Sequence, residues 1–159
     1  MWYNISMNIT GKVQIENTKS NGETWVSPWM CNLVVLSEDH GGNLVIKRLG
    51  GSNQYSMNIT HGDIGVDGTA PNDADTQLGD AKARAVGFKT DETTDSVTFR
   101  FFFPDSLVPN DTYKEFGAFI DGGNTINTGQ MWNRLLFDID YSKSSGEDTT
   151  VSLVLSINN

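Results

Sequence analysis

The stretch Val97-Thr-Phe-Arg-Phe-Phe-Phe103 decides the fold class. Its apolar side chains at the first, third, fifth and seventh positions recur with a period of two, which is typical of a β-strand with one buried face. Pro104 follows, and proline ends a strand because it cannot donate a ladder hydrogen bond. The stretch therefore predicts a strand whose inner face is aromatic.

The same period recurs downstream. Polar turns bound an apolar segment at 113–120, and alternation returns in two further segments that contain Leu135, Phe137, Ile139 and Tyr141, and then Val151, Leu153, Leu155 and Ile157. The turns predict a strand at 113–120, and the alternation of the two later segments predicts strands with one buried face.

The N-terminal half begins with a longer alternating segment, residues 3–16, interrupted on its apolar side only by Gly11. We interpret Gly11 as a possible bulge. Asn21-Gly22 is a strong turn signal, and it predicts a returning strand over Glu23–Trp29. Segments 56–60 and 84–89 predict two more strands.

Two segments depart from this pattern. Asn43–Leu49 lies between glycine pairs, which favours a two-turn helix with Leu44, Val45 and Leu49 on one face, and a hairpin strand is the competing interpretation. Asp63–Asp80 is rich in Gly, Asp and Asn and predicts a long surface loop. The whole pattern predicts one all-β domain over residues 1–159, an antiparallel β-sandwich or jelly-roll-like fold with at most one or two short helices.

Composition argues against several partners. The net charge is −9 and the pI about 4.5, which disfavours binding to a phosphate backbone, so no nucleic-acid partner is expected. No apolar run approaches the ~20 residues of a membrane span, and the N-terminus lacks signal-peptide features, so synthesis in the cytoplasm is expected. Cys31 is a lone cysteine and is expected to be a small buried hydrophobe.

Catalytic and metal chemistry find little support. His40 and His61 are expected to be exposed turn residues, and one Cys with two His supplies too few ligands for zinc. The Asp63–Asp80 loop is rich in oxygen ligands, which leaves a solvated loop and a calcium site as alternatives. We expect no catalytic residues, no metal and no cofactor.

The aromatic residues allow three interpretations, namely core packing, a subunit interface and a sugar-stacking platform. Trp132 is expected at a rim, and it joins Trp2 and Tyr3 as candidates for an interface. The remaining aromatic residues considered for such surfaces are Trp25, Trp29, Tyr55 and Tyr113.

A set of short motifs occurs in a fixed order along the chain. It comprises Asn32-Leu33-Val34, the segment from Ile64 to Leu78 with Arg84 beyond it, Glu115-Phe-Gly-Ala-Phe119, Gly122-Gly123, Asn133-Arg-Leu-Leu-Phe137 and Lys143. This colinear set resembles small virion proteins of tailed bacteriophages, which occur at the neck, baseplate or fibre attachment.

The resemblance implies a non-enzymatic structural subunit that is made in the host cytoplasm and resides in the virion. Its partners would be other virion proteins and copies of itself, in a ring or trimer with heterologous contacts. Glu115 and Arg134 lie on neighbouring predicted strands, and we expect them to form a pair that fixes register within the sheet or across subunits. The alternative functions are a carbohydrate-binding β-sandwich for host-surface recognition and, third, a glycan hydrolase.

Overall fold

The computed structural model describes residues 8–158. These residues form ten strands, one α-helix and one 3-10 helix, and their bounds are β1 (Asn8–Lys19), β2 (Thr24–Val26), β3 (Met30–Cys31), β4 (Leu33–Val34), α1 (Gly41–Leu49), β5 (Ile59–Gly65), β6 (Ala81–Glu92), β7 (Ser96–Phe103), η1 (Asp105–Leu107), β8 (Asp111–Ile120), β9 (Gln130–Lys143) and β10 (Glu147–Asn158). The prediction of an all-β fold with few short helices is confirmed.

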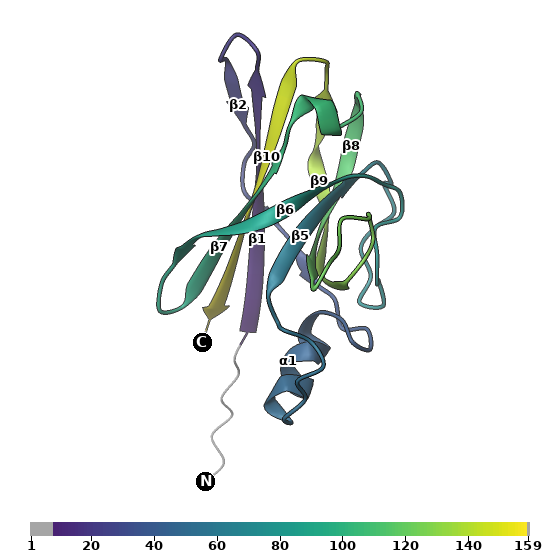
Figure 1. Ribbon diagram of the computed structural model, residues 1–159. Coiled ribbons are helices and arrows are strands. Elements are labelled where there is room, and N and C mark those ends of the chain that lie inside the picture. Colours follow the sequence, from purple (N-terminus) through teal and green to yellow (C-terminus); the bar gives the residue numbers. More distant parts are fainter. Residues whose placement is uncertain (1–7, 159) are drawn as a thin grey trace.

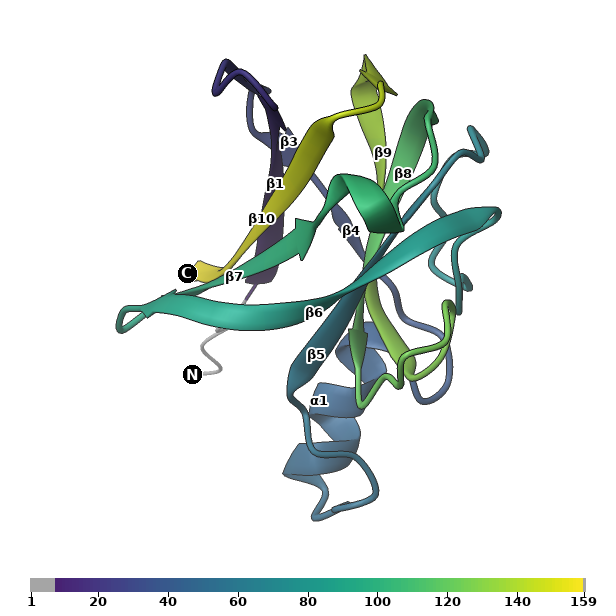
Figure 2. The same cartoon turned by 45° about the horizontal axis from the view of Figure 1, so that its top comes forward.

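The strands form one antiparallel sheet in the order β2-β1-β10-β7-β6-β5-β8-β9-β4. Figures 1 and 2 show that this sheet curls, so that its two halves face each other. The long strand β6 belongs to both halves, because its end at Gly87–Glu92 pairs with β7 and its start at Ala81–Val86 pairs with β5. The two layers of the predicted sandwich are therefore two halves of one continuous sheet.

One short segment, Met30–Val34, closes the gap between the two edges of the curled sheet. Met30 pairs with Val13 of β1, whereas Val34 pairs with Asn133 of β9. Between them, the Asn32 backbone N–H donates to the Gly11 carbonyl at 3.1 Å. This segment thus joins β1 to β9.

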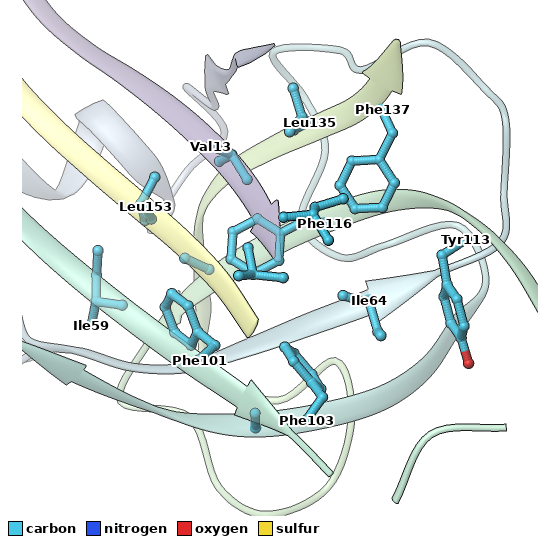
Figure 3. Packing of buried hydrophobic residues seen from close by; sticks show 14 of the residues in the cluster. Val13, Ile59, Ile64, Phe101, Phe103, Tyr113, Phe116, Leu135, Phe137 and Leu153 are labelled. Carbon is cyan, nitrogen blue, oxygen red and sulfur yellow. The ribbon is translucent and has the colours of Figure 1, made fainter. Parts of the chain in front are cut away.

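The main core lies between the two halves of the sheet (Figure 3). Phe101 and Phe103 of β7 are fully buried, whereas Phe102 between them points outward and is half exposed, as the alternation predicts. The ring of Phe101 packs against that of Phe116 on β8, with centroids 5.3 Å apart at an interplanar angle of 60°. Val13 of β1 and Leu153 of β10 contribute to the same core.

A second, smaller core covers the opposite face of β8 and β9. It consists of Val35, Leu78, Ala81, Phe119 and Met131. Side chains alternate between the faces of a strand, so Phe119 lies on the face opposite to Phe116 and Ala118, which belong to the main core. Strands β8 and β9 are therefore buried on both sides.

The long first strand is present, but its bulge is not. Strand β1 pairs with β10 without interruption from Asn8 opposite Asn158 to Lys19 opposite Glu147. A Cβ atom at Gly11 would lie 2.2 Å from Oδ1 of Asn32, so glycine is required by close approach of the closing segment. The part of the predicted strand before residue 8 lies outside the described residues.

The predicted turn at Asn21-Gly22 joins β1 to β2, and Gly22 has a φ of 83°. The returning strand is shorter than predicted, because β2 ends at Val26.

The helix predicted at Asn43–Leu49 is present as α1, which begins two residues earlier at Gly41. Its predicted apolar face is correct for Leu44, which is buried, and for Val45, which packs against the main core, but wrong for Leu49, which is exposed at the end of the helix. No helix among residues 8–158 has the length and apolar character needed to cross a membrane.

Two other predictions are corrected. Strand β5 continues to Gly65, so Asp63 belongs to a strand and the connecting loop covers only residues 66–80. Cys31 is exposed rather than buried, because it lies on the narrow closing segment, where alternate side chains point outward.

Candidate functional site

The predicted contact between Glu115 and Arg134 is present within the chain. Glu115 on β8 and Arg134 on β9 are 0% and 3% exposed, and Oε2 of Glu115 lies 2.8 Å from Nη2 of Arg134. Gly117 is the residue directly opposite Arg134 in the ladder, so the pair spans the two strands diagonally. Its role in fixing register stays a prediction.

The remaining donors of Arg134 hold the loop over residues 66–80. Nη1 donates to Asp75 at 2.8 Å, and Nη2 donates to Asp67 at 3.0 Å and to the Thr69 carbonyl at 3.2 Å. The Glu115 carboxylate in turn accepts backbone N–H groups of Gly79 and Asp80. Both buried charges thus have full sets of partners, which offsets the cost of removing them from water.

Asp67 and Asp75 of this loop are therefore engaged with a cation of the protein itself. The pKa of Asp67 is lowered, first by the hydroxyl hydrogen bond from Thr69 and further by Arg134. Among residues 8–158, no three His, Cys, Asp or Glu side chains come close enough together to hold a metal ion. The interpretation of the loop as a calcium site is therefore not supported by any such cluster within the described residues.

A second buried arginine, Arg84 on β6, holds the loop over residues 121–129. It forms a two-pronged ion pair with Asp63 on β5, in which Nη2 donates to Oδ2 at 3.0 Å. Its Nη1 donates to the Gly123 carbonyl at 2.7 Å and to the Thr128 carbonyl at 3.0 Å. The Asn127 backbone N–H donates to the same Asp63 carboxylate at 2.7 Å.

The two loops also contact each other. Oδ1 of Asn127 accepts the backbone N–H of Leu78 at 3.0 Å. Arg134 and Arg84, together with this contact, fix both loops against the outer faces of β5, β8 and β9. The two arginine clusters therefore form a scaffold for the loops.

Both histidines differ from the sequence prediction. His61 is buried in β5, and burial lowers its pKa. His40 is partly buried just before α1, and its Nδ1 accepts the Met131 backbone N–H at 2.9 Å. Neither is an exposed turn residue, because β5 begins before His61 and α1 packs against β9 beside His40.

The aromatic candidates separate into two groups. Trp132 is 5% exposed and Tyr113 is fully buried, so both belong to the main core and the rim position predicted for Trp132 is wrong. Trp2 and Tyr3 lie outside the described residues. Trp25 and Trp29 remain as exposed tryptophans.

Trp25 borders a hollow of about 290 Å³ at the end of the β1–β2 hairpin. Its ring is parallel to that of Tyr141 on β9, with centroids 6.2 Å apart at an interplanar angle of 6°. Sequence reasoning missed this site because the two aromatic residues are far apart in the chain. Their juxtaposition depends on the pairing of β1 with β10.

The outer surface of β6 and β7 carries three exposed apolar side chains, Val86, Phe88 and Phe102, which we call the β6–β7 patch. Phe88 is 62% exposed and lies opposite Arg100 in the ladder. Nη2 of Arg100 is 3.7 Å from Oε2 of Glu16 on β1, so both charge signs border the patch.

No family model, no curated protein and no solved structure matches this chain. The resemblance to tailed-phage virion proteins therefore rests on the colinear motifs alone.

Proposed function

We propose that this chain is a non-enzymatic structural subunit of a tailed-phage particle and that two copies associate through the β6–β7 patch. The colinear motifs support the place in the particle. The observation that carries the association is the cluster of Val86, Phe88 and Phe102 on one outer surface. Single exposed apolar residues are ordinary, whereas a contiguous group on one face is typical of an interaction surface.

Strand register brings the three side chains together. Gly87 of β6 lies opposite Phe101 of β7, so the outward residues on either side of these positions are neighbours across the ladder. Phe102 lies opposite Thr150 of β10, which extends the same face with a small polar residue. A partner that covers this face therefore meets the three apolar side chains together with Arg100, which lies opposite Phe88.

The charges next to the patch favour a second copy as the partner. A chain with a net charge of −9 repels its own copies on most approaches. This face is different, since exposed Arg100 and Glu16 lie on it side by side. A two-fold axis through the patch would place Arg100 of each copy near Glu16 of the other, and a two-fold contact uses the same surface on both copies.

A two-fold contact of this kind produces a closed assembly of two copies. It differs from the heterologous ring or trimer contact that the phage resemblance implies, and the sizes of the two assemblies distinguish them.

Sedimentation velocity over a concentration series tests the association. We expect a monomer–dimer equilibrium for the wild type and a shift to monomer for the double variant Phe88→Thr/Phe102→Thr. Leu49→Thr is the matched control, because Leu49 is also exposed but lies at the end of α1, which packs against β9. A wild type that stays monomeric, a ring-sized assembly, or a double variant that associates like the control would overturn the proposed contact.

Peptide mass spectrometry of density-purified particles tests the virion role separately. We expect the chain in tailed particles at a fixed stoichiometry. Its restriction to the soluble fraction, while particles form without it, would overturn that role.

A further inference from the structure

The hollow beside Trp25 lies at the end of the molecule opposite α1, where Figure 1 shows β2 next to the ends of β9 and β10. Trp25 lies opposite Asn17 in the β1–β2 ladder, so its side chain is on the same face of the hairpin as the buried Asn17. That face meets Tyr141 of β9, on which Trp25 stacks.

Tyr141 gives the tryptophan a fixed support. Its ring is buried, and its hydroxyl bonds with Nδ2 of Asn17 at 3.1 Å and with the Thr149 hydroxyl. Trp25 nevertheless stays 45% exposed. One face of this aromatic side chain is held by Tyr141, and the rest is open to a ligand. Ligand binding therefore costs little conformational entropy at this side chain.

Asp140 and Glu147 line the same hollow. The Asp140 carboxylate makes no hydrogen bond within residues 8–158 and is exposed. Glu147 uses Oε2 to accept from Asn17 and from the Ser144 backbone N–H, which leaves Oε1 free of partners from the same part of the chain. The Ser144 hydrogen bond lowers the pKa of Glu147, so this carboxylate is ionised at neutral pH.

We propose that this hollow binds an uncharged pyranose sugar, whose apolar face lies on Trp25 and whose hydroxyls donate to Asp140 and Glu147. A pyranose combines an apolar C–H face with a rim of hydroxyls, and the hollow presents the complementary pair of surfaces. Hydrogen bonds from hydroxyls to ionised carboxylates are shorter and stronger than neutral ones. Ligand pockets measure about 300–1,000 Å³ for drug-sized molecules, so a hollow near the lower limit suits one or two sugar rings.

The charges around the hollow select against acidic sugars. Three carboxylates, from Glu23, Asp140 and Glu147, face a single ammonium group from Lys19. That ammonium is already paired with Glu23 at 2.9 Å. A sialic or uronic acid would therefore bring its carboxylate into a negative environment.

Trp29 shows why exposure alone does not define such a site. It is exposed to almost the same degree as Trp25, but it does not border the hollow. Instead, Nζ of Lys12 lies 4.8 Å from its ring centroid. Trp29 is therefore the natural control for Trp25.

Saturation-transfer difference NMR tests the proposal with four probes, the methyl glycosides of glucose, galactose, mannose and N-acetylglucosamine. We expect transfer to the ring protons of at least one probe, its loss in Trp25→Ala and its retention in Trp29→Ala. Transfer to none of the four, or equal loss in both variants, would overturn the sugar site. Equal transfer to the methyl glycoside of N-acetylneuraminic acid would contradict the charge argument.

A second variant tests the site independently of whether Trp25→Ala folds. Asp140 is exposed and makes no structural hydrogen bond within the described residues, so Asp140→Asn is expected to fold like the wild type and to weaken binding of the responding probe about tenfold. Unchanged affinity would remove Asp140 from the site and contradict the proposed pose.

The sugar site does not depend on the proposed dimer. The variant Phe88→Thr/Phe102→Thr is expected to bind the probe like the wild type, so failure of one proposal leaves the other intact.

Discussion

At the residue scale, the two buried arginines explain how two glycine-rich loops keep one conformation. The loops over residues 66–80 and 121–129 have few regular backbone hydrogen bonds of their own. Arg134 and Arg84 supply donors to both, and each arginine is anchored by a strand carboxylate, Glu115 or Asp63. Conformational order in the loops therefore originates in side chains that belong to the sheet.

Replacing Arg134 with Met tests this dependence. The change would leave the Glu115 carboxylate buried without its cation, and removal of one partner from a buried pair costs about 3–5 kcal/mol of unfolding free energy. Urea unfolding followed by circular dichroism measures the loss. Lys19→Met, which removes the exposed pair with Glu23, is the control and should change stability little. Equal effects for the two variants would contradict the proposed anchoring role.

The sequence contains part of this arrangement. Glu115 and Arg134 could be paired in advance because the strands that carry them are clear in the alternation. The pair of Asp63 and Arg84 was not predicted, because Asp63 is the first residue of a segment whose composition is typical of a loop. A usable signal was present, because Arg84 lies between two alanines of a strand and an arginine in such a place requires a buried acceptor.

The misplaced Trp132 has a different cause. Met131 pairs with Phe119 and Asn133 pairs with Ala118, so Trp132 lies at a shift in the register of β8 and β9, and its side chain joins the main core. The local alternation of a sequence does not show where such a register shift occurs.

At the element scale, the turn between β9 and β10 is held by carboxylates whose charge matters. Nζ of Lys143 lies 2.5 Å from Oδ1 of Asp105 in η1, and Glu147 accepts from the Ser144 backbone N–H. The first contact lowers the pKa of Asp105, and the second lowers that of Glu147. Both carboxylates therefore favour the folded state when ionised.

The sign of the pH effect follows directly. A carboxylate with a lowered pKa in the folded protein adds stability above its unfolded value, 3.8 for Asp105 and 4.5 for Glu147, and that stability is lost as the pH falls through the folded pKa. We expect these two carboxylates to make the Tm fall as the pH drops below these values. Differential scanning fluorimetry measures the profile. The variant Asp105→Asn/Glu147→Gln should show a smaller fall, and an identical fall would assign the effect to other carboxylates.

Elements differ in how well they could be foreseen. The strands β7, β9 and β10 follow from alternation, and β8 follows from the polar turns on either side of it. The closing segment Met30–Val34 could not be foreseen, since its two short strands exist only where two distant edges approach each other. The helix α1 was correctly placed by its flanking glycines, and of its predicted buried face only Leu49 was misassigned.

At the scale of the whole molecule, the main core contains residues from both halves of the sheet. Strand β6 joins the halves on one side and Met30–Val34 joins them on the other. Neither half can bury its apolar face alone. The fold class followed from the alternation, whereas the sharing of β6 between the halves depends on pairings that a single sequence does not specify.

This arrangement predicts cooperative unfolding. Differential scanning calorimetry should give one transition, with a calorimetric enthalpy equal to the van't Hoff enthalpy. Two separate transitions would mean that one half of the sheet stays folded without the other. The measurement should be made at low protein concentration, so that dissociation of a dimer does not add to the enthalpy of unfolding.

The pairing of β1 with β10 has a consequence during synthesis. The first described strand leaves the ribosome early, but its long neighbour emerges only after more than a hundred further residues. Until then the edge of β1 that pairs with β10 stays open, and open strand edges are prone to aggregation. The nascent chain is thus a natural client for a chaperone, and recombinant production should improve when translation is slowed by cooling or when a holdase is supplied.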